Sequence, residues 1–211
     1  MKKQTLKLLK NIGVDTRYIS YTKTTIYINN LRFSKFSRKK EETFKKYYPQ
    51  TTIIRSSLLQ KICNRASKIL SQELKPRDKI TLPKITDKKT ELIHIILEPY
   101  TRKYGIQIIK EGKPDKKIGT QTLNLETYNI LTTIFNGEGI PNTIKTTPPT
   151  INPLINIPND WIEAFTNEKI NNYPKNKYKE ITLDFMDFIK PIIPSYKENI
   201  LQSREYLKKE I

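Results

Sequence analysis

The residues best suited to bind an anion stand where an expected strand meets a helix, in the run Ile53-Ile54-Arg55-Ser56-Ser57. A guanidinium, two hydroxyls and the free N–H groups of the first helical turn could converge there on one phosphate. The alternative is that Ser56 only caps the helix and Arg55 lies on the surface, because serine is among the commonest N-cap residues. The glycines of a P-loop or a dinucleotide-binding loop are missing, so we predict neither.

A second group of cations, Lys84, Lys88 and Lys89, follows the next expected strand. Lysines in the first turn of a helix oppose its dipole, at a cost of roughly a few tenths of a kcal/mol each, unless an anion lies there. Ligands of parallel sheets bind at the carboxyl edge of the strands. We therefore expect these lysines and Arg55 to face one phosphate-bearing ligand or a nucleic-acid backbone, although Glu91 offsets part of their charge.

The densest basic stretch, residues 34–48, mixes cations with aromatic rings. Ser37 is expected to cap a helix that carries Phe44, Tyr47 and Tyr48 on one side and cations on the rest. We predict that the cations follow a phosphate backbone and that an exposed Tyr47 or Tyr48 stacks on unpaired bases, as in single-stranded RNA recognition. The alternative is an amphipathic helix with buried aromatic rings and solvated amines. The cations are Arg38, Lys39, Lys40, Lys45 and Lys46.

Positive charge is concentrated in the first half of the chain. Residues 1–111 hold 26 Lys and Arg against 9 Asp and Glu, so they carry +17 of the net +18, whereas residues 112–211 hold 13 against 12. A general bias toward lysine would charge both halves alike. The asymmetry indicates a surface for a polyanion, most commonly nucleic acid, and the alternative is a basic surface that only aids solubility. The interleaved aromatic residues and the lack of a helix-turn-helix pattern favour RNA over DNA.

No arrangement of residues typical of catalysis stands out. His94 is the only histidine and lies in an apolar run, so it is expected to be a packed or surface residue rather than a base. Cys63 is the only cysteine, which excludes an internal disulfide and a cysteine-based zinc site. We therefore expect no metal and no cofactor, and whether the protein is an enzyme stays open. The available acids and bases are Asp78, Asp87, Glu91 and Glu98.

A repeated strand–helix pattern between residues 48 and 111 is expected to position these residues. Short β-branched runs at 51–54, 79–82 and 106–109 alternate with helical patterns at 56–74 and from Asp87 to about 104. Such alternation predicts a βαβαβ core with a mostly parallel sheet in a three-layer α/β fold.

The N-terminal residues should add a helix and a β-hairpin to this core. Apolar spacing predicts the helix over 2–11. Strands are expected at 18–22, 24–28 and 31–33, with Asn29-Asn30 as a two-residue hairpin turn.

The C-terminal third is expected to be helical. A strand at 118–123 that pairs back antiparallel and a helix ending near Phe135 lead to a Pro-rich connector, residues 146–158. The predicted domains are a basic α/β domain (1–145), this connector, and a helical extension (159–211) with helices at 160–166, 178–190 and 196–209. Its apolar stripe is expected to pack on the α/β body or, as the alternative, on a second subunit.

The combined sequence features predict a nucleic-acid-associated protein that binds a phosphate backbone, with RNA processing or modification as its setting. No run reaches the length of a membrane span and no secretory signal is visible, so a cytoplasmic location is expected. One alternative is an enzyme that binds a nucleotide or another phosphate-bearing ligand at the carboxyl edge of the sheet. The other alternative is a scaffold component of a ribonucleoprotein.

Overall fold

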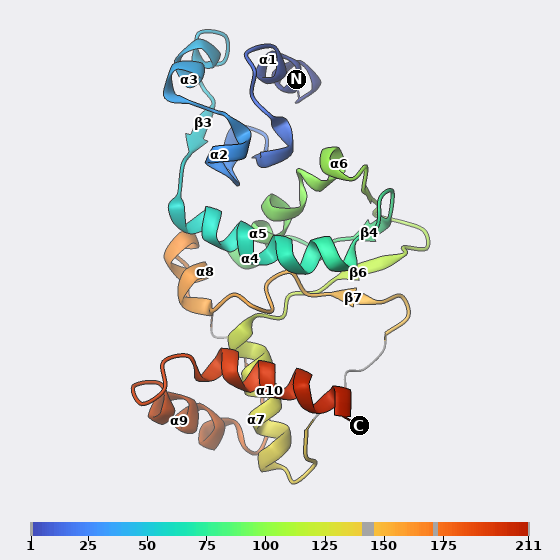
Figure 1. The fold of residues 1–211 in the computed structure, drawn as a ribbon, viewed down its shortest axis with the longest axis vertical. Helices are drawn as coiled ribbons and strands as arrows, with labels where there is room; N and C mark the ends of the chain where they lie inside the picture. Colours follow the sequence, from blue (N-terminus) through green and yellow to red (C-terminus); the bar gives the residue numbers. More distant parts are fainter. Residues whose placement is uncertain (1, 141–145, 171–172, 211) are drawn as a thin grey trace.

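The computed structural model describes residues 2–140, 146–170 and 173–210 and shows three tiers along the long axis of the molecule (Figure 1). An N-terminal unit lies at one end, a four-stranded sheet with its helices in the middle, and two tail helices at the other end. The N-terminal unit consists of α1 (Lys2–Asn11), the 3-10 helix η1 (Thr16–Tyr18), β1 (Ile19–Tyr21), β2 (Thr25–Ile28), α2 (Leu31–Ser34), α3 (Arg38–Lys45) and β3 (Thr52–Ile54).

The N-terminal unit has its own three-stranded sheet, of order β1-β2-β3. The antiparallel pairing of β1 with β2 confirms the predicted hairpin, and β3 pairs with β2 in parallel. The sheet differs from our prediction in one respect, because β3 does not join the strand at 79–81. The alternation of strands and helices in a sequence does not determine which neighbouring strand a given strand pairs with. Here β2 offers a free edge, and Ile53 packs on the core that contains Ile26 and Phe44.

The predicted turn at Asn29-Asn30 and the predicted strand at 31–33 are wrong. The hairpin turns earlier, where the N–H of Thr22 donates to the carbonyl of Thr25 at 2.9 Å. Asn30 instead caps α2, because its side-chain oxygen accepts from the N–H of Phe33 at 3.0 Å. Asparagine suits a helix N-cap as well as a turn, so the dipeptide alone did not distinguish the two.

The central sheet is wholly parallel, with the order β5-β4-β6-β7. Helix α4 crosses the body of the molecule next to it (Figure 1), and the apolar side chains of both meet in the largest buried cluster. The predicted α/β class with a mostly parallel sheet, an N-terminal hairpin and a helical extension is thereby confirmed. The strands are β4 (Lys79–Thr81), β5 (Gln107–Ile108), β6 (Lys116–Ile118) and β7 (Thr150–Ile151), and the helices are α4 (Ser57–Glu73), α5 (Lys88–Leu97), α6 (Tyr100–Lys103) and α7 (Leu123–Phe135).

Strand β6 is parallel to its neighbours, so the prediction of an antiparallel strand at 118–123 is wrong. A link as short as residues 109–115 usually joins antiparallel strands. This link instead crosses the amino end of β4, where the carboxylate of Asp115 accepts from the N–H of Lys79 and its own N–H donates to the Lys79 carbonyl, both at 2.8 Å. The Pro-rich stretch then supplies β7 beside β6.

The strand order reverses between β4 and β6. From β4 the chain passes first to β5 on one side and then to β6 on the other. In open α/β sheets the crevice outside the carboxyl ends at such a point is the usual place for a ligand. Residues 82–84 and 119–121 follow β4 and β6 and therefore lie at this crevice.

The C-terminal helices are α8 (Asn159–Thr166), α9 (Lys179–Ile189) and α10 (Tyr196–Glu210), close to the predicted bounds. Helix α8 contacts α4 and α5, whereas α9 and α10 pack on α7. The apolar stripe of α9 is partly used in that packing, since Met186 is buried with Tyr128 and Tyr196 while Phe188 is 66% exposed. Among the described helices, none combines the length and apolar character needed to cross a bilayer.

Candidate nucleic-acid interface

Three cations on α3 and at its C-cap make no ion pair within the described residues. Arg38, Lys39 and Lys46 are exposed and have no ion-pair partner among the described residues. Lys40 differs, because its ammonium donates to the carbonyls of Gly13 and Lys35 at 2.6 and 2.9 Å. Lys45 pairs with Glu41 in the next turn at 3.0 Å. The predicted basic stretch therefore divides into residues that hold the N-terminal unit together and residues available to a polyanion.

The two predicted stacking residues also differ in their surroundings. Tyr48 is half-buried and stacks on Phe44, with 5.2 Å between ring centroids and 24° between planes. Phe44 is fully buried and meets Phe36 edge-on. Tyr47 is 68% exposed. Of the pair, Tyr47 is the ring that a base could reach.

The side chain of Arg55 is engaged within the N-terminal unit. Its guanidinium donates to Glu41 Oε2 at 2.7 and 3.1 Å and to the Phe36 carbonyl at 2.7 Å, and it lies 5.2 Å from the centre of the Phe36 ring. Ser56 caps α4 by accepting from the N–H of Leu59 at 3.1 Å, and Ser57 is exposed in the first turn. Arg55 is not among the residues that line a hollow with Lys88, because its guanidinium is bound to Phe36 and Glu41. Arg55 therefore does not belong to the surface proposed for RNA.

The pair of Glu41 and Arg55 should make stability depend on acid pH. Burial raises the pKa of Glu41, but its hydrogen bonds and charge contacts with Arg55 and Lys45 outweigh burial and hold the pKa below the ordinary 4.5. A carboxyl with a lowered folded-state pKa adds stability above its unfolded pKa, and this is lost as the pH falls through the folded pKa. We expect Glu41→Gln to reduce the unfolding free energy by about 2 kcal/mol at pH 6.

Urea unfolding of the natural protein and of Glu41→Gln between pH 6 and pH 3 measures this effect. The gap between the two proteins should narrow as the pH falls through the folded-state pKa of Glu41, because the carboxyl then becomes protonated in both states of the natural protein. A gap that stays constant over this range contradicts the assignment.

The start of α5 is already occupied by carboxylates of this chain. Asp87 caps the helix through a capping box with Thr90. The backbone N–H of Lys88 donates to Glu168 at 3.0 Å, and its ammonium pairs with Glu91 at 2.8 Å. Lysines near the start of α5 oppose its helix dipole, which suggested a bound anion. Carboxylates of the protein itself supply that negative charge. Of the other two predicted lysines, Lys84 is exposed and Lys89 is 92% buried.

A hollow of about 370 Å³ is lined by residues from both of the strand ends at which we predicted a phosphate-bearing ligand. Ser56 at the end of β3 and Lys88 at the start of α5 both line it, with residues of α8 opposite. The remaining walls are mostly apolar, and burial is the main cause that raises the pKa of Tyr27 in one of them. The polar groups of this hollow are engaged in a helix cap and an ion pair, so it offers few free contacts. It is lined by Tyr27, Ile54, Ser56, Leu58, Lys88, Glu91, Leu92, Ile95, Ala164, Phe165 and Thr166.

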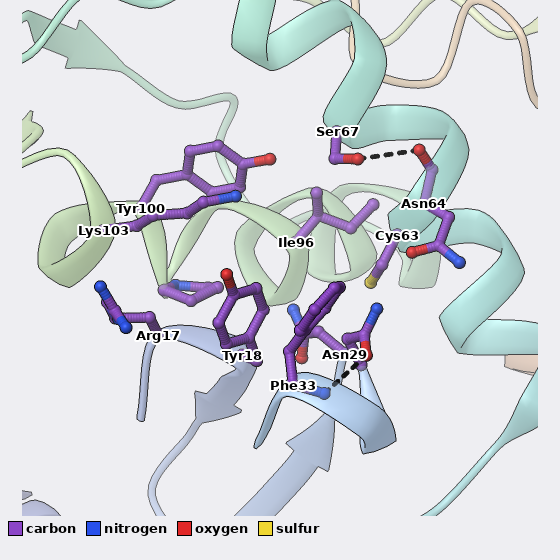
Figure 2. A pocket seen from close by; sticks show the side chains of 12 residues that line it. Arg17, Tyr18, Asn29, Phe33, Cys63, Asn64, Ser67, Ile96, Tyr100 and Lys103 are labelled. Atoms are coloured by element: carbon purple, nitrogen blue, oxygen red, sulfur yellow. Dashed lines mark hydrogen bonds between the residues drawn. The ribbon is translucent and has the colours of Figure 1, made fainter. Parts of the chain in front are cut away.

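A second hollow, of about 200 Å³, was not predicted from the sequence (Figure 2). It lies where the N-terminal unit meets α4 and the segment from α5 to α6. Its residues come from four separate stretches of the sequence, and no local pattern joins them. It combines aromatic rings, side-chain amides and two cations. It is lined by Arg17, Tyr18, Asn29, Asn30, Phe33, Cys63, Asn64, Ser67, Ile96, Pro99, Tyr100 and Lys103.

The parallel four-stranded sheet, with its helices and the mixed N-terminal sheet, defines an α/β protein. Among solved structures, the chain is similar to the U34-tRNA thiolase NcsA from Methanococcus maripaludis, a structure that contains a [4Fe-4S] cluster. The TM-score is 0.55 at 12% sequence identity, and the match covers 78% of this chain and 84% of that one. No protein-family model matches the chain, and no curated protein matches it in sequence.

The similarity to NcsA extends to the fold but not to cluster ligands. Iron–sulfur clusters are held mainly by cysteine thiolates. These 211 residues contain one cysteine, Cys63, which is buried, and burial raises its pKa to about 12. The described residues also contain no group of three or more His, Cys, Asp or Glu side chains able to hold a metal ion. The residues present therefore do not fit such a cluster.

Proposed function

We propose that this protein binds RNA through the exposed cations of its N-terminal unit and acts in RNA modification. The observation that carries the proposal is the group Arg38, Lys39 and Lys46 on α3, exposed and without carboxylate partners among the described residues. These cations belong to the part of the chain that carries +17 of the net +18. Unpaired cations on one helix are suited to a phosphate backbone, whose neutralisation releases counterions.

RNA is favoured over DNA by the exposed aromatic side chains of the same unit. Tyr47 is 68% exposed and Phe33 is 50% exposed. Flat rings beside cations suit single strands, whose bases are free to stack, whereas bases inside a duplex are not. The similarity in fold to a protein that acts on tRNA supports the same choice of nucleic acid.

The test is the salt dependence of binding to a single-stranded RNA. Each phosphate neutralised contributes about −0.7 to the slope of log affinity against log salt. Replacing Arg38, Lys39 and Lys46 together by glutamine should therefore make the slope shallower by about 2. The matched control replaces Lys175, Lys177 and Lys190, three exposed lysines of the C-terminal part, by glutamine and should leave the slope unchanged. Equal slopes for the two triple variants, or no RNA binding, would contradict the proposal.

A second candidate function is binding of a nucleotide or another phosphate-bearing ligand at the crevice between β4 and β6. The strand order favours it, because the reversal lies between these strands. Lys84 is exposed just after β4, and Gly119 follows β6. A ligand bound only by the folded state raises the unfolding temperature with its concentration. Saturable stabilisation by a nucleotide that Lys84→Gln abolishes would support this function, and stabilisation independent of Lys84 would not.

A further inference from the structure

The hollow of Figure 2 has an aromatic wall. The rings of Tyr18 and Phe33 lie next to each other, with 5.2 Å between centroids and a tilt of 33° between planes. Phe33 belongs to α2, is half exposed and has Arg32 5.9 Å from the centre of its ring. Every base has a π-face, so an exposed ring of this kind binds bases of any sequence by stacking.

The hollow also presents two side-chain amide nitrogens that have no hydrogen-bond acceptor within the described residues. Asn29 is 93% buried, and its side-chain oxygen accepts from the hydroxyl of Ser20 at 2.9 Å. Its amide nitrogen has no acceptor within the described residues. The side-chain amide of Asn64, on α4, likewise makes no hydrogen bond there. Neither amide nitrogen is a buried atom without a partner, so each can donate to an acceptor atom of a ligand in place of water. The edges of a nucleobase offer such acceptors beside donors.

Two cations flank the aromatic wall. The ammonium of Lys103 lies 5.5, 5.4 and 5.3 Å from the ring centres of Tyr18, Tyr100 and Tyr104, and no carboxylate pairs with it in the described part of the chain. Arg17 is held by Asp15 at 2.7 Å, yet its side chain is 58% exposed. A phosphate next to a stacked base would meet both charges.

The volume of the hollow and the residues that line it limit the kind of ligand that it can bind. Pockets for whole drug-sized ligands usually measure about 300–1,000 Å³. At about 200 Å³ this hollow suits a single flat ring system rather than a complete nucleotide with its phosphates. Ile96 and the buried thiol of Cys63 contribute to its lining. Because burial raises the pKa of Cys63 to about 12, the thiol is neutral and suits an uncharged base.

We propose that this hollow binds one unpaired base of a bound RNA strand, stacked on Phe33 and Tyr18, with an adjacent phosphate between Arg17 and Lys103. The inference rests on the proposed RNA binding and identifies the site at which the protein binds a base of the RNA strand. Bases before and after the inserted one would follow the cations of α3 in the same N-terminal unit.

The test uses short single-stranded RNAs in which 2-aminopurine occupies each position in turn, because its fluorescence falls when it stacks on an aromatic ring. One position should be quenched by the natural protein and not by Phe33→Leu, which keeps an apolar side chain but lacks a π-face. Phe33→Leu should also weaken RNA binding about 5- to 150-fold, the range expected for one base–aromatic stack. Phe188→Leu, which alters a 66% exposed ring of α9, is the matched control and should change neither result.

A second measurement does not depend on a variant. RNA with 4-thiouridine at the quenched position should crosslink on irradiation to peptides that contain Tyr18, Phe33 or Tyr100. Salt-dependent RNA binding without any quenched position, or quenching that persists in Phe33→Leu, overturns the base pocket and leaves the proposed function intact. Absence of RNA binding overturns both.

Discussion

Replacing Arg102 by methionine should lower the free energy of unfolding by about 3 to 5 kcal/mol, the usual result of removing one partner of a buried ion pair. The Arg102 guanidinium donates twice to the Glu98 carboxylate, at 2.5 and 2.7 Å, and to the carbonyls of Thr16 and Ile19 at 3.0 and 2.8 Å. Only 15% of the Arg102 side chain and 14% of that of Glu98 are exposed. The substitution withdraws four donated hydrogen bonds and leaves two backbone carbonyls without this donor.

The effect should concentrate where the N-terminal unit joins the central body. Glu98 also accepts from the backbone N–H of Tyr21 at 3.2 Å, so the pair connects α6 and the end of α5 with η1 and β1. We expect hydrogen exchange of β1 amides to accelerate more than that of α7 amides. Lys169→Met is the control, since Lys169 is 83% exposed and its pair with Glu163 should be worth less than about 1 kcal/mol. Equal losses in the two variants would contradict the assignment.

Replacing Arg204 by methionine should cost a similar amount, about 3 to 5 kcal/mol, at the opposite end of the molecule. Arg204 of α10 pairs with Glu126 in the first turn of α7, and their side chains are 9% and 14% exposed. Glu126 also accepts from the side chain of Gln121 at 3.2 Å. The pair therefore fixes the position of the tail helix on α7 in addition to the apolar contacts of Leu201 with Leu123.

A double-mutant cycle with Arg204→Met and Glu126→Gln isolates this interaction from the other effects of each change. Residues in direct contact show coupling free energies of about 0.5 to 3 kcal/mol, whereas independent residues add. We expect clear coupling, measured by urea unfolding. Additive losses would mean that Arg204 stabilises the tail without the Glu126 pair, through packing and its ion pair with Glu205.

Helices and their caps followed from the sequence because their causes are local. The spacing of Leu59, Ile62 and Ala66 predicted the buried face of α4, and all three are fully buried. Ser37, Ser56 and Asp87 cap the helices that they were expected to cap. A cap and a helical face depend on residues within a few positions of each other, and such residues are visible in the sequence.

The partners of strands and of charged side chains did not follow from the sequence. β3 pairs with β2 rather than β4, and Arg55 meets Glu41 instead of a ligand. The roles proposed for Arg38, Lys39 and Lys46 remain predictions, since their exposure shows only that they are available. Nothing near Phe33 in the sequence pointed to Tyr18, Asn64 or Lys103 as its neighbours.

The α/β class, most of the helices with their approximate bounds, and the concentration of positive charge in the first 111 residues could be predicted from the amino-acid sequence alone. These properties depend on composition and short-range spacing. The division into two sheets, the set of lysines without an ion-pair partner among the described residues, and the hollow surrounded by rings, amides and cations from four separate stretches became visible only in the folded structure. Burial, pairing and charge compensation depend on contacts between residues far apart in the chain, and those contacts exist only after folding.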